Sequence, residues 1–313
     1  AFALLLSGRL AEGWKLYEQR WADRTRSARP AFYEPQAEWP GPAVPLAGKA
    51  IAVYAEQGWG DVLQFLRYVP PLQALGARVC CVVQAQLVPL VEASFPGVEC
   101  LAAGRELTVQ VHAALLDLPG RLGTTSETIP AHVPYLRAPQ AARERWGQRL
   151  ATYAGKPRIG LAWSGSRAQV NNNNRALPLS ALRPLVGAAD AHWFNLQKGD
   201  AGPWTDTSPD AAGLVDLTGG WTDFGESAAM LEALDLVITV DTSIAHLAGA
   251  LGKPVWILLA PNADWRWLLE REDSPWYPSA RLFRRGFGEG RPAQVARVRQ
   301  ALAAWRQAFA VAG

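Results

Sequence analysis

The most constraining feature of the sequence is a strand, a turn and a helix between residues 236 and 254. Leu236–Val240 is a short aliphatic run without periodic polar positions, which is typical of a strand buried on both faces of a parallel sheet. The helix-capping types Asp-Thr-Ser follow at 241–243, and Ile244–Leu251 has a helical pattern that a glycine and a proline end. The turn therefore opens at the carboxyl edge of a sheet, and other strands must pair with this one.

The rest of the chain repeats the alternation of strand and helix. Strand-like runs are predicted at Ala50–Ala55, Arg78–Val83, Val98–Leu101, Arg158–Trp163, His192–Leu196, Leu214–Leu217 and a run ending at Leu259. Val109–Leu118 is a further apolar segment. Helices are predicted at 62–75, Leu87–Ser94, Leu179–Val186 and around Glu226–Leu234, with Ala141–Tyr153 as a connector. Such alternation predicts an α/β fold with two Rossmann-like domains, at residues 37–150 and 151–313.

Both ends of the chain show helical spacing of apolar residues. Residues 1–36 contain the pattern L-x-x-G-R-x-x-E-G-W-x-x-Y-E-x-R-W, which resembles the closing helices of a tetratricopeptide array. A proline-rich stretch at Pro30–Gly48 is predicted to be a linker. Pro292–Phe309 is predicted to be a terminal helix, and we expect its apolar stripe to pack near the junction of the two domains.

Composition excludes several classes of protein. With 313 residues, 49% hydrophobic and 19% charged, the chain has the balance of a globular protein. A net charge of +3 with scattered basic residues gives no case for nucleic acid as a partner. No apolar run has the length of a transmembrane segment. Three cysteines, Cys80, Cys81 and Cys100, lack metal or redox spacing, and we expect them to be reduced in a cytoplasmic protein.

The turn after Val240 has the features of an anion site. The first amides of a helix have no intrahelical acceptor and lie at the positive end of its dipole, so a phosphate in front of Thr242 and Ser243 would meet backbone donors. His246 lies four residues after Thr242 and hence on the same helical face. Lys198 follows the apolar run 192–196, at the edge where doubly wound sheets bind ligands. A purely structural interpretation fits the same residues equally well: a well-capped crossover helix with a histidine and a lysine at the surface.

Several motifs, taken in order, resemble one family. The block D-T-S-I-A-H-L-A-G-A-L-G-K-P at 241–254 is similar to the nucleotide-sugar motif of the heptosyltransferase-like glycosyltransferases, glycosyltransferase family 9. It resembles most the bacterial proteins that carry such a domain behind tetratricopeptide repeats. Further matching pieces are A-E-Q-G-W-G-D-V-L-Q-F-L-R-Y at 55–68, I-G-L-A-W-S-G at 159–165, L-Q-K-G at 196–199, D-W-R-W-L-L-E-R-E-D-S-P-W-Y-P at 264–278 and R-L-F-R at 281–284.

The resemblance implies a GT-B architecture, in which two Rossmann-like domains face a cleft. The domain at 37–150 would lie on the acceptor side, and the domain at 151–313 would bind the nucleotide sugar. In such enzymes a Gly-Asp pair faces the cleft and its aspartate is the proposed acceptor base, which corresponds to Gly60 and Asp61. An N-cap role for Asp61 competes with this interpretation.

The remaining candidates would hold the donor. They are Asp241, Thr242 and Ser243 at the turn, His246, Lys198, Gly60 of the facing loop, Ser164 after the first strand of the second domain, and Glu226 for the ribose hydroxyls. Glu226-Ser227 departs from the Asp-Thr of related sequences. Asn171–Asn174 and Arg175 fit the resemblance in part, but the polar run favours a mobile loop.

Other chemistries are disfavoured by the sequence. Gly58 and Gly60 lack the third glycine of a dinucleotide fingerprint, and no G-x-S-x-G nucleophile motif is present. Four histidines without ligand spacing and the lack of D-x-D predict that no metal and no cofactor is used. We therefore expect an inverting, metal-independent glycosyltransferase that uses a nucleoside diphosphate sugar and a glycan, lipid-linked or protein acceptor. The alternative is a catalytically silent nucleotide-binding or scaffold module, whose helical N-terminus binds a protein partner.

Overall fold

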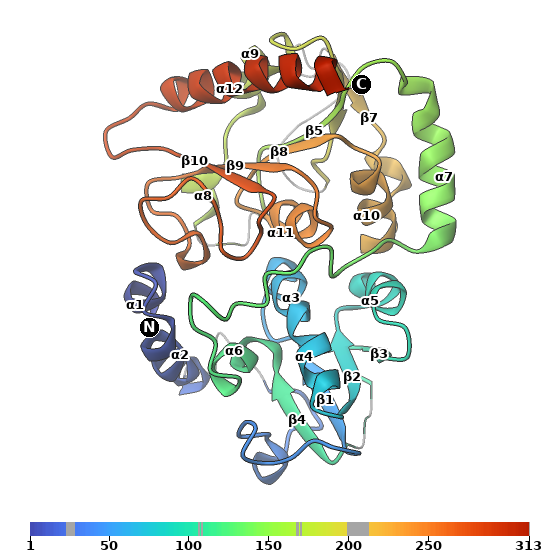
Figure 1. The fold of residues 1–313 in the computed structure, drawn as a ribbon, viewed down its shortest axis with the longest axis vertical. Helices are drawn as coiled ribbons and strands as arrows, with labels where there is room; N and C mark the ends of the chain where they lie inside the picture. The colour runs from blue at the N-terminus through green and yellow to red at the C-terminus, as the bar shows by residue number, and fades with distance from the viewer. Residues whose placement is uncertain are drawn as a thin grey trace.

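Two parallel sheets organise the chain (Figure 1). The computed structural model describes residues 1–22, 29–105, 107, 109–166, 169, 171–198 and 213–312. The first sheet has the order β3-β2-β1-β4, and the second has the order β10-β9-β8-β5-β6-β7. Every pairing recorded between named strands is parallel, which confirms the predicted α/β class.

The strands of the first sheet all lie between residues 50 and 114. They are β1 (Ala50–Tyr54), β2 (Arg78–Val83), β3 (Glu99–Ala102) and β4 (Val111–Ala114). Ile51 of the central strand lies between Val79 and Val111 in the register. The helices between and after these strands are α3 (Trp59–Phe65), α4 (Val69–Ala74), α5 (Val88–Ser94) and α6 (Leu118–Arg121), and α7 (Gln140–Leu150) connects the two halves.

The strands of the second sheet lie between residues 158 and 284. They are β5 (Arg158–Ala162), β6 (His192–Asn195), β7 (Leu214–Asp216), β8 (Leu236–Val240), β9 (Val255–Leu259) and β10 (Ala280–Arg284). In the register, Ile159 of β5 lies beside Leu236 of β8. The helices are α8 (Asn172–Arg175), α9 (Leu179–Val186), α10 (Phe224–Glu232), α11 (Ser243–Ala250) and α12 (Arg291–Ala312), with a 3₁₀ turn, η9, at Trp265–Trp267.

Alternating residues of the second sheet build two separate cores. Leu236, Ile238 and Val240 of β8 pack on the side that α9 and α12 cover, whereas Val237 packs on the side of α10 and α11. All five residues of β8 are buried, as expected for a central strand covered on both faces. The β8–α11 unit therefore forms where the sequence predicts it.

The terminal helix α12 does not pack near the domain junction, and that prediction was wrong. Its stripe Val295, Val298 and Leu302 is buried against α9 and the outer face of the second sheet, on the side away from the first half (Figure 1). The reason is that α10 and α11 already cover the inner face, so the outer face is the apolar surface left to cover. The amide of Gln294 anchors α12 by donating to the carbonyl oxygens of Leu259 and Phe283 at 2.9 and 2.6 Å.

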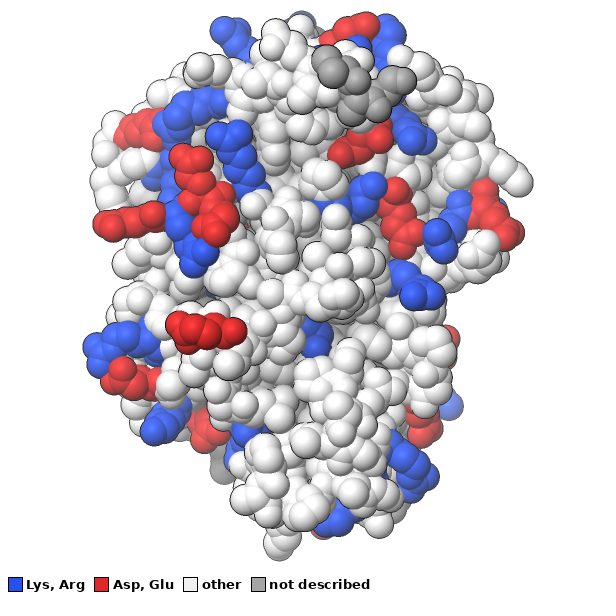
Figure 2. All heavy atoms as spheres, viewed as in Figure 1, with Lys and Arg blue, Asp and Glu red and all other residues white. Residues whose placement is uncertain are grey.

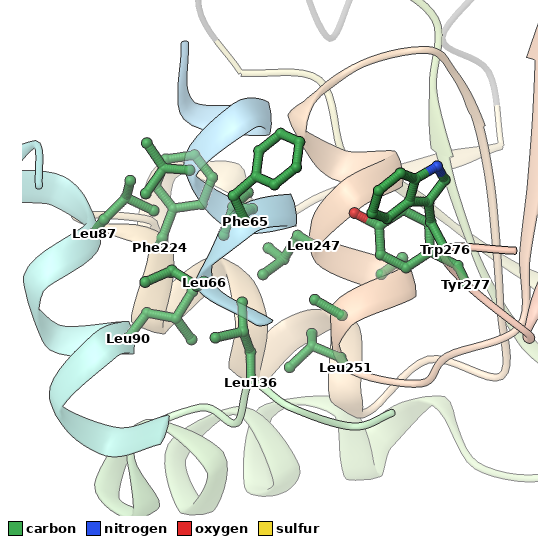
Figure 3. Close-up of a cluster of buried hydrophobic side chains, with 14 of the residues drawn as sticks. Phe65, Leu66, Leu87, Leu90, Leu136, Phe224, Leu247, Leu251, Trp276 and Tyr277 are labelled. Atoms are coloured by element: carbon green, nitrogen blue, oxygen red, sulfur yellow. The ribbon is translucent and has the colours of Figure 1, made fainter. Parts of the chain in front are cut away.

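The two halves share one hydrophobic core. Side chains from both halves meet between α3, α5, α10 and α11 (Figure 3). Figure 3 labels Phe65, Leu66, Leu87 and Leu90 from the first half, Leu136 from the connector, and Phe224, Leu247, Leu251, Trp276 and Tyr277 from the second. Burial of this apolar surface holds the carboxyl ends of the two sheets toward each other.

The N-terminal helices touch both halves. α1 (Phe2–Leu6) and α2 (Leu10–Tyr17) form where helical spacing predicts them. Trp14 donates from Nε1 to the carbonyl oxygen of Thr124 at 3.0 Å, and its ring lies edge-on to Trp265, with 5.3 Å between ring centroids. The predicted linker also packs, since Trp39 is fully buried and its amide donates to the carbonyl oxygen of His112 at 2.8 Å. The tetratricopeptide context and the domain boundaries stay predictions.

Candidate functional site

A cleft of about 860 Å³ lies where the carboxyl ends of the two sheets meet. Its lining comes from the turns after β1, β5, β6 and β8, and from the segments that begin α10 and η9. This size is in the range of small-molecule sites, and its place is the one where open α/β sheets bind ligands. The cleft contains every predicted site residue except Glu226.

The β8–α11 turn forms one wall of the cleft. Thr242 has extended backbone angles and caps α11, and its Oγ1 accepts the amide hydrogen of Ile244 at 3.2 Å. Ser243 is the first helical residue and also lines the cleft. No acidic residue lies in the first turn of α11. The positive end of this helix dipole therefore faces the cleft without a carboxylate of its own turn.

Asp241 lies just before this turn, and its charge is strongly influenced by its surroundings. Its pKa is raised to about 6, chiefly by burial and also by Asp264, while Arg175 and Arg266 oppose the rise. One carboxylate oxygen lies 4.0 Å from Nε2 of His246. Asp241 is thus mostly ionised near physiological pH although its pKa is raised, and the guanidinium groups of Arg175 and Arg266 offset its charge beside Thr242.

His246 is held from several sides. Its ring stacks on Trp267, with 5.4 Å between centroids and 21° between planes, and Nδ1 lies 2.9 Å from the hydroxyl of Tyr277. A Cβ built on Gly60 would lie 2.9 Å from its Cδ2, so the loop of the first half reaches the imidazole only because residue 60 is glycine. Burial, together with Arg266, Arg67 and Arg175, holds the pKa of His246 well below its ordinary value.

The β1–α3 turn forms the opposite wall. Gly58 caps α3 without a side chain, and Asp61 lies in the first turn. The Asp61 carboxylate pairs through Oδ1 with the guanidinium of Arg266, which comes from the other half and also pairs with Asp264 at 2.8 Å. Burial raises the pKa of Asp61, and Arg266 opposes that rise. The ion pair across the cleft favours the ionised form of the Asp61 carboxylate and fixes its position.

Arg175 is a cleft residue that the sequence analysis assigned to a mobile loop. Short helix α8 is anchored by Asn172, which is buried and accepts the amide hydrogen of Gly165 at 3.0 Å. Gly165 leaves no room for a Cβ beside the Arg175 guanidinium. Within the described residues, no carboxylate pairs with Arg175 or with Lys198. The sequence did contain a signal for Arg175, because Asn174-Arg175 fits the family resemblance, but the surrounding run of asparagines favoured a loop instead.

Two further predicted residues, Ser164 and Lys198, line the same cleft as Arg175. Ser164 is buried, and its amide donates to Oε1 of Gln197 at 2.9 Å. Lys198 lines the cleft and donates from Nζ to the carbonyl oxygen of Trp221. Its ammonium is thus held at the cleft by this contact. Gly199, the last residue of the L-Q-K-G motif, lies outside the described residues.

Glu226 is the one predicted site residue that the structure places elsewhere. Its carboxylate pairs with Arg145 and accepts a hydrogen bond from Nε1 of Trp146 at 2.7 Å, both on α7. The side chain therefore fastens α10 to the connecting helix, and its neighbours Asp223 and Ser227 line the cleft instead. Asp223 also caps α10 by accepting the amide hydrogen of Glu226 at 3.1 Å.

Neither a metal cluster nor a spanning helix is found in the part of the chain that the structure describes. There, no three or more His, Cys, Asp and Glu side chains gather in a way that could hold a metal ion. The helices of that part are also too short or too polar to cross a membrane. On the face shown in Figure 2, charges of both signs are interspersed and the region where the halves meet is mostly uncharged.

Part of the sequence matches the profile of one family. Residues 212–290 match the profile of glycosyltransferase family 9 (heptosyltransferase), a segment that includes β8 and α11. Over 309 residues the chain is 30% identical to Protein FlbA of Caulobacter vibrioides, an alignment that covers 90% of this chain and 50% of that protein. The chain thus spans about half the length of this curated relative.

Solved structures share the fold at low sequence identity. A glycosyl transferase family 9 structure from Veillonella parvula is 12% identical with a TM-score of 0.60, over 83% of this chain and 98% of that chain. E. coli ADP-heptose lps heptosyltransferase II is 15% identical with a TM-score of 0.56, over 82% and 99%. E. coli heptosyltransferase WaaC with ADP is 14% identical with a TM-score of 0.51, over 81% and 98%. The matched segment and the shared GT-B-like fold together support a glycosyltransferase with a family 9 domain.

Proposed function

We propose that this chain is an inverting, metal-independent glycosyltransferase that transfers a sugar from a nucleoside diphosphate sugar to a hydroxyl of a glycan, lipid-linked or protein acceptor. The observation that carries the proposal is a single cleft in which the start of α11 and the cation of Arg175 face Asp61 from the other half. An anion site and a carboxylate on opposite walls are what such a transfer needs.

The α11 wall is suited to the diphosphate of the donor. The helix start supplies backbone donors and a favourable dipole, and Arg175 and Lys198 supply positive charge. As the bond to the sugar breaks, negative charge grows on the leaving diphosphate, and these groups would stabilise it in the place that a divalent ion takes in other enzymes. We propose Asp241, Thr242, Ser243, Ser164 and His246 as the groups that orient the donor.

The α3 wall is suited to the acceptor. A general base must be ionised before it can accept a proton, and Arg266 keeps Asp61 in that form. Burial at the same time raises the basicity of the carboxylate. Arg266 binds Oδ1 of Asp61, and we propose that Oδ2 accepts the proton of the acceptor hydroxyl.

The proposed reaction is one displacement. The acceptor oxygen forms a bond to the anomeric carbon on the face opposite the leaving group, and its proton passes to Asp61. The bond between the anomeric carbon and the phosphate oxygen breaks, and the electron pair leaves with the diphosphate. One displacement inverts the configuration at the anomeric carbon.

Two of the structural neighbours point to the first donor to test. Their descriptions name ADP-heptose and ADP, so an adenosine diphosphate sugar is the natural starting point. We would titrate a panel of nucleoside diphosphates by calorimetry and then measure hydrolysis or transfer of the matching donor sugars. Binding of one nucleotide in the panel and turnover of its sugar, with the anomeric configuration inverted in the product's NMR spectrum and activity retained in EDTA, is the expected result.

Other outcomes separate the alternatives. Failure of every nucleoside diphosphate to bind would remove the premise of a donor site. Binding without turnover of any donor, in the presence of acceptor extracts, would favour the silent nucleotide-binding module. Action behind tetratricopeptide repeats, a protein partner at the helical N-terminus and a cytoplasmic location stay predictions from the sequence.

A further inference from the structure

The imidazole of His246 has one edge in the buried core and the other at the cleft. Nδ1 lies 2.9 Å from the hydroxyl of Tyr277, and one ring face is covered by Trp267. The opposite edge, with Cδ2 and Nε2, faces Gly60 and lines the cleft. The chemical character of Nε2 therefore depends on which of the two ring nitrogens carries the hydrogen.

Tyr277 lies in a fully buried group of polar side chains. It is completely inaccessible to solvent, and the guanidinium carbon of Arg67 lies 4.9 Å from the centre of its ring. Arg67 donates to the hydroxyl of Tyr135 at 3.2 Å, and that hydroxyl donates to the carbonyl oxygen of Leu63 at 2.9 Å. Burial raises the pKa of Tyr277 well above its ordinary value, so its hydroxyl keeps a proton that it can donate.

The charges around His246 keep the ring neutral. Burial and the guanidinium groups of Arg266, Arg67 and Arg175 all lower its pKa, and the facing carboxylate of Asp241 lies 4.0 Å from Nε2. A neutral imidazole has one N–H and one bare nitrogen. A lone pair on Nε2 would face the Asp241 carboxylate, whereas a hydrogen there is attracted to it, so electrostatics favours the hydrogen on Nε2.

We propose that Tyr277 is a positioning residue: its hydroxyl donates to Nδ1 and thereby fixes neutral His246 in the tautomer whose Nε2–H is presented to the diphosphate. Tyr277 is fully buried and does not line the cleft, so its hydrogen bond to Nδ1 does not depend on a contact with the donor. The assignment of the tautomer does not depend on the proposed function, whereas the contact between Nε2–H and the diphosphate rests on it. His246 then acts as a neutral hydrogen-bond donor in the cleft and does not transfer a proton.

Nitrogen-15 NMR of the histidine rings tests the tautomer directly. The chain has four histidines, and a His246→Gln variant identifies the signals of His246 by their loss. We expect a protonated Nε2 and a bare, hydrogen-bonded Nδ1 in the wild type, and a mixture of tautomers in Tyr277→Phe. A wild-type spectrum with the hydrogen on Nδ1 would overturn the proposal, and so would an unchanged tautomer in Tyr277→Phe, because Asp241 alone would then set it.

Tyr68→Phe is the matched control for Tyr277→Phe. It also removes a buried hydroxyl, but one that is hydrogen-bonded to Oγ1 of Thr124 at 2.9 Å. It should leave the His246 tautomer as in the wild type. A change of tautomer in Tyr68→Phe as large as in Tyr277→Phe would show that general disturbance of the core is responsible, which contradicts a specific role of Tyr277.

Inorganic pyrophosphate tests the second part without knowledge of the nucleotide. We expect its addition to shift the Nε2–H signal, and Tyr277→Phe to weaken its binding roughly threefold to tenfold, as for loss of one neutral hydrogen bond. Binding of pyrophosphate with no shift at His246 would overturn the donor role. Lack of any pyrophosphate binding would contradict the proposed function, while the tautomer would still be decided by the spectra of the free protein.

Discussion

The two walls of the cleft are built from the same kind of unit but differ in charge. Both have a buried parallel strand, a turn and a short helix: β8 with α11, and β1 with α3. α11 is capped by the hydroxyl of Thr242 and has no acid in its first turn. α3 is capped by Gly58, which has no side chain, and has Asp61 in its first turn. The start of α11 is therefore open to an anion, whereas the start of α3 has its own carboxylate.

This difference implies a division of labour. A diphosphate would be repelled from the α3 start by Asp61, whereas at the α11 start it meets a helix dipole and Arg175. Arg266 of the second half reaches across and binds Asp61, so the charge on the α3 wall is controlled from the α11 side. We therefore expect changes on the α3 wall to affect turnover, and changes on the α11 wall to affect nucleotide affinity.

The largest expected effect is that of Asp61→Asn on turnover. The amide keeps the shape of the side chain but cannot accept the acceptor proton, and loss of a general base lowers turnover by about 10²–10⁴-fold. Asp264→Asn is the matched control because it also removes one carboxylate from Arg266 without removing the proposed base. Steady-state kinetics should show a much smaller loss for this control, and equal losses would mean that Asp61 acts only through Arg266.

Arg175→Ala should have the next largest effect, on nucleotide affinity. A hydrogen bond to a charged group contributes about 1.5–3 kcal/mol, which is a loss of roughly tenfold to hundredfold in affinity. Arg183→Ala is the control, because Arg183 is exposed on α9 and does not line the cleft. Calorimetry with the nucleoside diphosphate that binds the wild type would measure both. Normal binding by Arg175→Ala would show that the two walls do not differ in the way described.

Gly60→Ala tests the close approach of the two walls. The added methyl would lie 2.9 Å from Cδ2 of His246, and overpacking of this kind typically costs about 1–3 kcal/mol of unfolding free energy. Gly147→Ala is the control, since a Cβ at this helical position meets nothing within 4 Å and should stabilise α7 by about 1 kcal/mol. Urea denaturation of both variants should show opposite signs. A stable Gly60→Ala would mean that the walls separate easily.

The smallest expected effect is on the pH dependence of stability. Burial raises the pKa of Asp241 from its ordinary value of 3.8 to about 6, so the folded chain binds a proton that the unfolded chain has released between these values. Stability from this group is therefore present at low pH and is lost as the pH rises toward about 6. We would measure the free energy of unfolding between pH 3.8 and about 6. Asp241→Asn should reduce its dependence on pH by an amount that corresponds to less than one bound proton. If the pH dependence of stability in Asp241→Asn were the same as in the wild type, another titrating group would be responsible for it.

The sequence predicted the fold where the signals are local. The β8–α11 unit has a buried aliphatic strand, capping residues and a terminating glycine in one continuous stretch, and each of these signals acts between neighbouring residues. The predicted position of α12 was wrong because the same apolar stripe can pack on either side of a sheet. Which side is free depends on α10 and α11, and a single helix does not contain that information.

The site was predicted in part for the same reason. Asp61 and Thr242 follow glycine-rich or capping patterns that are visible in the sequence, and both line the cleft. The partner of Asp61 could not be predicted, because Arg266 is separated from it by 205 positions and only the packing of the two halves brings them together. Glu226 shows the reverse case, since its carboxylate is occupied by Arg145 and Trp146 of a helix that precedes it by about 80 residues.

The most direct test of this division between the walls is a crystal structure of the chain with a bound nucleoside diphosphate. We predict that the diphosphate lies within hydrogen-bonding distance of Thr242, Ser243 and Arg175, with Asp61 across the cleft and still paired with Arg266. A diphosphate bound at the Gly58–Asp61 turn, with the α11 start empty, would contradict the account.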